Sequence, residues 1–330
     1  MSDEPTPRGS RDGDLVVDGG RTGVRLGRVG RAGVELLGAG PGLPLIAAAD
    51  GVARVTEAVA ALVEHHAPRP ADGDGTADGR ALAAGLSGAF EAMDRAVTLA
   101  DGLAARLGLA EVALGSDVLT SHLGALDGAP GVVAAVGTGT VVLGLDADGG
   151  WHRVDGWGPW VGDHGSGLDV GRRGLAAAMA AGDVRRGGSP ALADAARRRF
   201  GPLDQVPARI YADANPTALV ASFCPDVAAA ARDGDEVAQG IWAHAADAVT
   251  DAIVAAADAV FPDGPVAVSW AGSLLDLNDL LRDPVRSRLR ERRPNLTLRP
   301  PAGDALQGGA HLLARARPLA RHGLAHVRPA

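Results

Sequence analysis

The sequence predicts an α/β protein made of two related domains, with a helical insertion in the second domain. Two observations carry this prediction. Apolar runs of strand length alternate with longer runs of helical periodicity, which is typical of sheets covered by helices. The same order of elements then occurs twice: strand, turn, strand, strand, helix, strand, helix, strand, helix. A chain of 330 residues is also long for one core and natural for two.

The first half contains five apolar runs that end in glycine or polar residues and that we expect to form strands. They cover residues 15–17, 24–26, 34–37, 80–86 and 110–114. Three longer segments, residues 46–65, 90–107 and 118–126, have apolar residues at helical spacing. Between them, residues 68–79 form a polar, glycine-rich stretch that we expect to be a loop.

The second half repeats this plan. The expected strands cover residues 132–136, 141–145, 151–154, 266–270 and 296–298. The expected helices cover residues 168–181, 237–260, 274–289 and 305–317. Glycines and prolines repeatedly interrupt a mainly helical insertion at about residues 184–235. We therefore expect a disordered leader (1–13), a first domain (14–127), a second domain (128–318) and a tail (319–330).

Composition excludes several classes of function. The formal net charge is −8 and no basic block stands out, so binding to nucleic acid or to an anionic membrane is disfavoured. No apolar run spans a membrane, and the polar start lacks a signal core, so we expect a cytoplasmic protein. The single cysteine, Cys224, excludes an internal disulfide and predicts a buried, small apolar side chain. All 32 basic residues are arginines, so no lysine is present to bind phosphate or form a Schiff base.

Two glycine-rich turns, each following an apolar strand, open the two halves of the chain. The first is Asp18-Gly19-Gly20-Arg21-Thr22, where the carboxylate can hold Mg²⁺ and the glycine N–H groups can face phosphate. An ordinary hairpin is the alternative, because Asp-Gly is a common hairpin signal. The second is Gly137-Thr138-Gly139-Thr140, about 120 residues further on. A pair of such turns is more specific for a nucleotide's phosphates than either turn alone.

Two further strand ends carry chemistry. Asp117 follows Gly115-Ser116 at the end of a strand, where a carboxylate can take the proton of an attacking hydroxyl. Helix capping is the alternative role for Asp117. The turn Ala271-Gly272-Ser273 has small residues that allow a flat ring or a ribose to pack closely. Asp163 stands alone as a carboxylate in another glycine-rich turn.

These motifs carry a resemblance. The pair of phosphate turns resembles the sugar kinase, Hsp70 and actin ATPase superfamily. The block Gly156-Trp157-Gly158 followed by Gly162-Asp163-His164-Gly165-Ser166 is similar to the N-acetylglucosamine kinase branch, the BadF/BadG/BcrA/BcrD-type ATPases. The resemblance covers nearly the whole chain. It implies two ribonuclease H-like (actin-like ATPase) domains with an interdomain cleft, the cofactors ATP and Mg²⁺, an amino sugar or hexose as substrate, and a homodimer.

The resemblance also implies a role for each matching residue. Asp117 is the expected catalytic base, and Asp18 is the expected Mg²⁺ ligand. The residues expected to contact ATP are Gly19, Gly20, Thr22, Thr138, Gly139, Gly272 and Ser273. The residues expected to line the sugar site, besides Asp117, are Ser87, Gly88, Thr140, Gly156, Trp157, Gly158 and Asp163.

The sequence departs from the family pattern at four positions. Arg21 replaces a glycine of the first turn, and His164 replaces a glutamate. Leu43 and Val141 stand where the family has asparagines that contact sugar hydroxyls. Because a site built for a hydroxyl discriminates strongly, these two changes leave open which sugar and which hydroxyl are used.

Three other functions compete with the kinase. A sugar or nucleotide sensor of the same fold would explain the departures at Arg21, Leu43 and Val141. A serine hydrolase is suggested by Gly85-Leu86-Ser87-Gly88-Ala89, although the last residue of the elbow is alanine. The activators of 2-hydroxyacyl-CoA dehydratases are relatives that need two cysteines per chain for an iron–sulfur cluster, and Cys224 stands alone.

Overall fold

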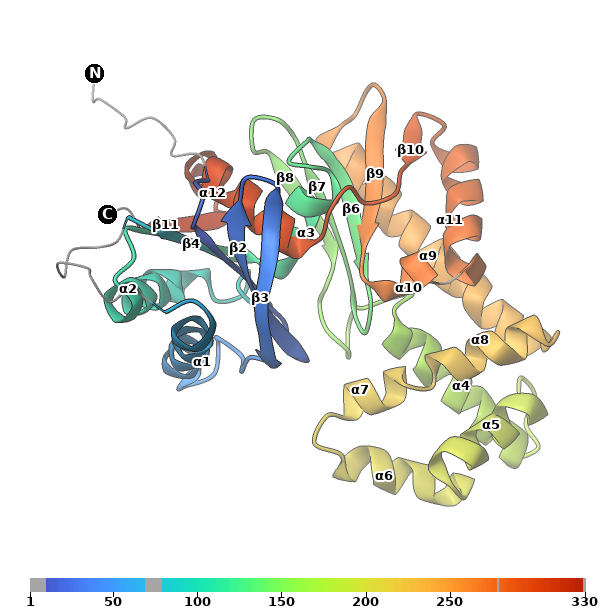
Figure 1. Cartoon of the computed structure of the whole chain (residues 1–330). Helices are drawn as coiled ribbons and strands as arrows, with labels where there is room; N and C mark the ends of the chain where they lie inside the picture. Colours follow the sequence, from blue (N-terminus) through green and yellow to red (C-terminus); the bar gives the residue numbers. More distant parts are fainter. Residues whose placement is uncertain (1–9, 69–78, 278, 329–330) are drawn as a thin grey trace. The chain divides into compact units, whose positions relative to one another are not determined.

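The computed structural model describes residues 10–68, 79–277 and 279–328 and contains two compact units (Figure 1). Unit 1 comprises Met1–Pro130, Leu145–Trp151 and Pro300–Ala330, and unit 2 comprises Gly131–Gly144 and His152–Arg299. Most of the predicted leader (residues 1–9) and of the predicted loop (residues 69–78) lies outside the described residues. Each unit has its own sheet and its own apolar core.

Unit 1 is built on a six-stranded sheet in the order β11-β5-β4-β1-β2-β3. Its strands are β1 (Leu15–Gly19), β2 (Gly23–Gly30), β3 (Gly33–Pro41), β4 (Ala81–Leu86), β5 (Glu111–Ser116) and β11 (Ala325–Arg328). Strands β1, β4 and β5 are parallel to one another, whereas β2, β3 and β11 each pair antiparallel with their neighbours. Strands β4 and β5 are buried along their whole length, as interior parallel strands covered on both faces must be.

Helices cover both faces of this sheet. They are α1 (Gly51–His66), α2 (Ala96–Leu107), α3 (Asp117–Ala125) and α12 (Ala305–Arg321), with a short 3-10 turn at Met93–Arg95. Apolar residues of α1 and α2 share one core with the sheet face that includes Leu82 and Leu114. On the opposite face, α12 packs over Val16 at Gly309, and α3 packs over Gly85 at Thr120.

Unit 2 contains a five-stranded sheet in the order β10-β9-β6-β7-β8, in which β9 runs parallel to β6 and β10. Its strands are β6 (Gly131–Val136), β7 (Thr140–Leu145), β8 (Trp151–Asp155), β9 (Val266–Ala271) and β10 (Leu296–Leu298). Its helices are α4 (Gly167–Gly182), α5 (Pro190–Phe200), α6 (Val206–Ala212), α7 (Pro216–Ala221), α8 (Cys224–Arg232), α9 (Glu236–Val260), α10 (Ser273–Leu277) and α11 (Asp279–Arg292), with a 3-10 turn at Leu203–Gln205. Helices α4 to α8 gather in one group, coloured green to yellow in Figure 1.

Polar caps and prolines explain where half of the described helices begin. Six helices start at a side-chain oxygen that accepts a backbone N–H of the first turn, which satisfies a group that the helix itself leaves unpaired. These caps are Ser116, Ser166, Ser189, Asn215, Asp235 and Asp304. Pro190 and Pro216, which the sequence marks as interruptions of the insertion, stand in the first turns of α5 and α7, where proline is favoured.

The end of the chain differs from the predicted division. The sequence predicts that residues 300–318 belong to the second domain and residues 319–330 to a tail, whereas the contacts place the described residues of this segment in unit 1. Helix α12 packs on α3, and β11 pairs with β5 in the register Ala325↔Gly115. The four residues of β11 are too few to show a strand period. In addition, the predicted helix at residues 90–107 begins only at Ala96, after the 3-10 turn.

Gly308 of α12 allows this helix to approach α3 closely. This close contact can be tested by substitution. A Cβ at Gly308 would lie 1.7 Å from the carbonyl oxygen of Thr120. We expect Gly308→Ala to lower the free energy of unfolding by about 1–3 kcal/mol, because backbone must move to admit the methyl group. Thermal unfolding measures the loss. Gly240→Ala in α9, where a Cβ meets open space, is the matched control and should raise the unfolding temperature; equal effects would contradict this packing.

Candidate active site

Three polar side chains meet at the carboxyl ends of the parallel strands in unit 1. Gly19 of β1 pairs with Leu86 of β4, and Leu86 pairs with Ser116 of β5. Asp18 and the residues that follow β4 and β5, Ser87 and Asp117, therefore lie at one edge of the sheet. In open α/β sheets, this is the edge at which ligands bind.

Asp117 is a half-buried carboxylate with a defined set of hydrogen bonds. The Ser87 hydroxyl donates to Oδ2, and the backbone N–H of Val118 donates to Oδ1 at 2.9 Å. Burial raises the pKa of Asp117, and the negative charge of Asp18 raises it further, while the two hydrogen bonds act in the opposite direction. Ser116, not Asp117, caps α3 by accepting the N–H of Leu119 at 3.2 Å. The capping role that competed for Asp117 is thus taken by its neighbour.

The turn between β1 and β2 is closely packed. The N–H of Gly20 donates to the carbonyl of Gly23 at 2.9 Å, and the carbonyl of Gly20 accepts from Leu43 at 2.9 Å. A Cβ at Gly19 would lie 2.5 Å from Leu43 Cδ1, so a larger residue there would displace the Leu43 side chain. Leu43, which replaces an asparagine of the family pattern, is buried in the core under this turn. Arg21 and Thr22 are exposed at its tip.

Sequence reasoning missed Arg25, which neutralises Asp18. Arg25 on β2 stands opposite Asp18 on β1, and its Nε and Nη2 donate to Asp18 Oδ2 at 3.1 and 2.7 Å. Its Nη1 donates to Asp304 Oδ2 at 2.6 Å, and Asp304 caps α12. The available signal was the register of the hairpin, which places residues 18 and 25 face to face.

In unit 2, the Gly137–Thr140 turn packs backbone against backbone with two other segments. The carbonyl of Gly137 accepts the N–H of Gly167 at 2.8 Å, at the start of α4. Gly272 has φ +84°, and a Cβ there would lie 2.5 Å from the carbonyl oxygen of Val136. The predicted nucleotide-binding residues of this unit therefore lie together. Thr138, Gly272 and Ser273 are all exposed.

Thr140 and Asp163 form the polar centre of this region. The N–H of Thr140 donates to Asp163 Oδ1 at 3.2 Å, and Gly139 leaves room for that carboxylate. Burial raises the pKa of Asp163 even though it accepts this bond. The Thr140 side chain is buried, and within the described parts of the chain its hydroxyl finds no hydrogen-bond partner. A buried hydroxyl without a partner is uncommon in folded proteins and singles out Thr140 among the polar residues of this turn.

Asp155, at the end of β8, is a second residue that sequence reasoning missed. Its carboxylate accepts the N–H groups of Gly156, Asp163 and His164 at 2.7, 2.7 and 2.9 Å. It also lies 3.0 Å from Nδ1 of His164. Both Asp155 and Asp163 adopt positive φ, +61° and +58°. Asp155 therefore closes the loop of residues 156–162, which we name the tryptophan loop, and orients Asp163.

The tryptophan loop carries its apolar side chains outward. Trp157 is 61% exposed, and the guanidinium of Arg153 lies 4.2 Å from its ring centroid. Gly156 packs against Val141, since a Cβ there would lie 2.9 Å from Val141 Cβ. Trp151 belongs to unit 1 instead, where its ring stacks on Phe90 with centroids 5.5 Å apart.

The remaining sequence signals have structural explanations. Ser87 donates its hydrogen bond to a carboxylate and not to a histidine, which removes the basis of the hydrolase alternative. Cys224 is buried, as predicted, and burial raises its pKa to about 12.

Among the described residues, no group of three His, Cys, Asp or Glu side chains could hold a metal ion. No described helix is long and apolar enough to cross a membrane.

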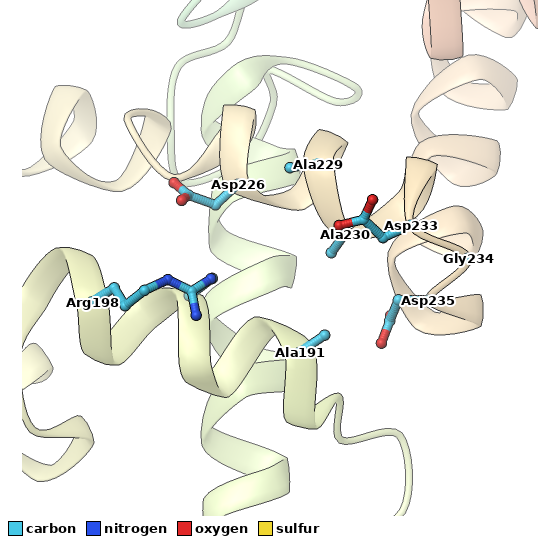
Figure 2. A pocket seen from close by; sticks show the side chains of 9 residues that line it. Ala191, Arg198, Asp226, Ala229, Ala230, Asp233, Gly234 and Asp235 are labelled. Atoms are coloured by element: carbon cyan, nitrogen blue, oxygen red, sulfur yellow. The ribbon is translucent and has the colours of Figure 1, made fainter.

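A separate hollow lies between α5 and α8, with a volume of about 340 Å³ (Figure 2). Arg198 reaches into it from α5, and Asp233 and Asp235 lie at its other end. Its floor is formed by alanines of both helices. None of the predicted site residues lines this hollow, so it is distinct from both groups of candidate residues described above.

The two sheets, their connections and the helices on them form the fold shared by actin-like ATPases and sugar kinases. The model of the BadF/BadG/BcrA/BcrD ATPase family matches residues 49–308, and the chain belongs to this family. None of the curated proteins matches the chain.

Solved structures agree with this assignment. The proposed N-acetylglucosamine kinase from Chromobacterium violaceum is 30% identical, over 91% of this chain and 99% of that one, with a TM-score of 0.70. The proposed N-acetylglucosamine kinase from Porphyromonas gingivalis is 19% identical, over 91% and 98%, with a TM-score of 0.66. A ROK family glucokinase from Streptomyces griseus, solved with glucose and AMPPNP, is 20% identical, over 92% and 99%, with a TM-score of 0.58. The last two show the fold alone.

The role of Asp155 can be tested by hydrogen exchange. Asp155→Gly keeps the positive φ without strain but removes the acceptor of three backbone hydrogen bonds. We expect exchange at the amides of Gly156, Asp163 and His164 to become at least about tenfold faster, since each lost hydrogen bond to a charged carboxylate is worth about 1.5–3 kcal/mol. Asp146→Gly is the control, because Asp146 accepts two N–H groups in a different turn. Unchanged protection in the tryptophan loop would contradict the role of Asp155.

Proposed function

We propose that this protein is an ATP-dependent kinase that phosphorylates a hydroxyl of an amino sugar or hexose. The observation that carries the proposal is Asp117, a half-buried carboxylate with a raised pKa, fixed by Ser87 at the carboxyl edge of the sheet beside the first phosphate turn. The relative from Chromobacterium violaceum, described as an N-acetylglucosamine kinase, supports an amino sugar as the acceptor.

In the proposed reaction, Asp117 accepts the proton of the sugar hydroxyl while that oxygen attacks the γ-phosphorus of ATP. A new P–O bond forms to the sugar, the bond from the γ-phosphorus to the bridging oxygen breaks, and ADP leaves. Burial brings the pKa of Asp117 closer to neutral pH, where a general base is most effective. Ser87 keeps the carboxylate in one orientation and lies beside the acceptor hydroxyl.

Mg²⁺ fits the chemistry of the first turn. Proteins usually hold this ion by one or two carboxylates together with substrate phosphates and water, and Asp18 provides such a carboxylate. Both hydrogen bonds from Arg25 reach Oδ2 of Asp18. Asp18 would hold the ion directly or through water, and the bound ion would offset phosphate charge. Arg25 limits the repulsion between Asp18 and Asp117.

The other predicted residues divide between nucleotide and sugar. Small or hydroxyl-bearing residues of the two turns would meet phosphate, and Gly272 and Ser273 would lie near the adenosine. The proposed phosphate contacts are Gly19, Gly20, Thr22, Thr138 and Gly139. The proposed sugar contacts are Ser87, Gly88, Thr140, Gly156, Trp157, Gly158 and Asp163. The unpaired Thr140 hydroxyl and the Asp163 carboxylate would bind two sugar hydroxyls.

The acceptor can be identified by incubating the protein with ATP and each of a panel of hexoses, amino sugars and N-acetylated sugars. The release of ADP is measured for each sugar. Leu43 is buried under the first turn and Val141 packs on Gly156, so neither offers a polar contact to the sugar. We therefore expect that polar contacts from Asp163 and Thr140 decide which sugar is the preferred acceptor. Absence of ADP release with every sugar in the panel would overturn the kinase proposal.

A non-catalytic sensor of the same fold is the second candidate, and one observation favours it. The Asp18 carboxylate is already neutralised by Arg25, so it has less charge to offer to Mg²⁺. Binding measured by calorimetry separates the two functions. A sensor binds a sugar or nucleotide without turnover, whereas the kinase forms a sugar phosphate and ADP in equal amounts.

The assignment of the base predicts that Asp117→Asn lowers kcat by about 10²–10⁴-fold, because an amide cannot accept the hydroxyl proton. Nucleotide affinity, measured by calorimetry, should remain unchanged. Asp148→Asn, in an exposed turn of unit 1, is the control and should keep full activity. If Asp117→Asn retained normal transfer, another group would have to be the base.

The hydrogen bond from Ser87 predicts a shift of the pH profile. This bond stabilises the ionised form of Asp117 and lowers its pKa, in opposition to the larger effect of burial. Ser87→Ala removes the bond, so the pKa rises and the base becomes ionised only at higher pH. The acidic limb of the kcat profile should therefore move to higher pH. Ser287→Ala, on the exposed side of α11, should leave the profile in place, and a shift to lower pH in Ser87→Ala would contradict the assignment.

A further inference from the structure

The tryptophan loop is fixed at its base but exposed at its tip. Asp155 accepts the N–H groups of Gly156 at one end and of Asp163 just past the other end. Within the loop, the N–H of Gly162 donates to the carbonyl of Gly158 at 3.0 Å. These bonds hold the backbone in a compact form, and the large side chains between the anchors point away from the core.

Three apolar side chains lie on this small loop. Trp157 is 61%, Trp160 90% and Val161 74% exposed. Among the described residues, eight large apolar side chains are substantially exposed, and three of them fall within these five consecutive positions. Single exposed apolar residues need no explanation, but a cluster of them on a rigid loop marks a binding surface.

The two tryptophans differ in what they already contact. The guanidinium of Arg153 lies 4.2 Å from the ring centroid of Trp157. In the part of the chain that the structure describes, Trp160 makes no ring or cation contact, and its whole ring is free to meet a ligand. Trp160 is three positions from Asp163, which we have assigned to the sugar site. One sugar ring bound at Asp163 and Trp157 would leave Trp160 and Val161 uncovered.

We infer that the acceptor is larger than a monosaccharide: it carries a second ring or an apolar substituent, which Trp160 and Val161 bind. This inference rests on the proposed function, because it takes Asp163 as a contact of the phosphorylated sugar. Flat aromatic rings suit this task, since they stack on the apolar faces of sugars and on aromatic substituents alike. The substrate class is therefore a glycoside, a disaccharide or an N-acylated sugar with a bulky acyl group.

A second copy of this chain is the alternative occupant of the patch. Stable protein interfaces use about 20–30 residues on each side, far more than three side chains. The patch also lies on the loop that ends directly before Asp163, and Asp155 binds the N–H groups of both Gly156 and Asp163, so the patch is close along the chain to a residue of the proposed sugar site. Both observations favour the substrate over a protein partner.

Kinetics with a matched pair of acceptors tests the inference. The probes are the free sugar that the wild-type protein phosphorylates and the phenyl glycoside of that sugar. We expect the glycoside to have a KM lower by about tenfold or more, as contact with a hydrophobic group commonly provides. Trp160→Ala should remove this advantage and leave the kinetics of the free sugar unchanged. Tyr211→Ala is the control, since Tyr211 is 88% exposed in α6 of the same unit.

Three results would overturn the inference. The first is equal KM values for the two acceptors in the wild type, and the second is an equal loss for both in Trp160→Ala. The third is a change of oligomeric state in Trp160→Ala, measured by analytical ultracentrifugation, with the preference for the glycoside retained. If no sugar is phosphorylated, the proposed function fails separately. Fluorescence titration with N-acetylglucosamine and its phenyl glycoside then decides the inference: tighter binding of the glycoside, lost in Trp160→Ala, supports it, and equal binding overturns it.

Discussion

Two carboxylates at one edge of a buried sheet must be held close together without repelling each other apart. In unit 1, Asp18 lies near the end of β1 and Asp117 directly follows β5. The negative charge of Asp18 raises the pKa of Asp117. Arg25 supplies the balancing charge on one side, and the Ser87 hydroxyl supplies a hydrogen bond on the other. Each partner is held by a different element, so the arrangement depends on the register of β1, β2, β4 and β5. The proposed chemistry needs this balance, because a base must be ionised yet close to losing its charge.

Much of this arrangement could be predicted from the sequence because it follows from local patterns. Apolar runs that end in glycine or a polar residue mark the carboxyl ends of strands, and parallel strands bring such ends together. That reasoning singled out Asp18, Ser87 and Asp117, and the structure places all three at one edge of unit 1. The same holds in unit 2 for Thr140 and Asp163, which are joined by a hydrogen bond. The two-sheet α/β fold and the buried position of Cys224 were also confirmed.

What could not be predicted depends on contacts between residues that carry no motif. Arg25 is one arginine among 32 until the hairpin register sets it against Asp18. Asp155 acts through its carboxylate and an unusual backbone angle, and a single aspartate before a glycine suggests only a turn. The placement of α12 and β11 in unit 1 is a matter of long-range pairing, which periodicity does not encode. Residues such as Arg25 and Asp155, which act on the site only through contacts made in the folded chain, are therefore found from the structure and not from the sequence.

The contribution of the C-terminal segment to unit 1 has a consequence for synthesis of the chain. Strand β11 and helix α12 complete the sheet and one face of unit 1, the unit that also contains the first strand of the chain. They leave the ribosome after all of unit 2, so unit 1 lacks one edge strand and a covering helix while unit 2 is being synthesised. Unit 2 is drawn almost entirely from residues 131–299 and can fold earlier. The apolar surface that α12 covers in unit 1 therefore stays exposed during this time, and exposed apolar surface of this kind favours aggregation.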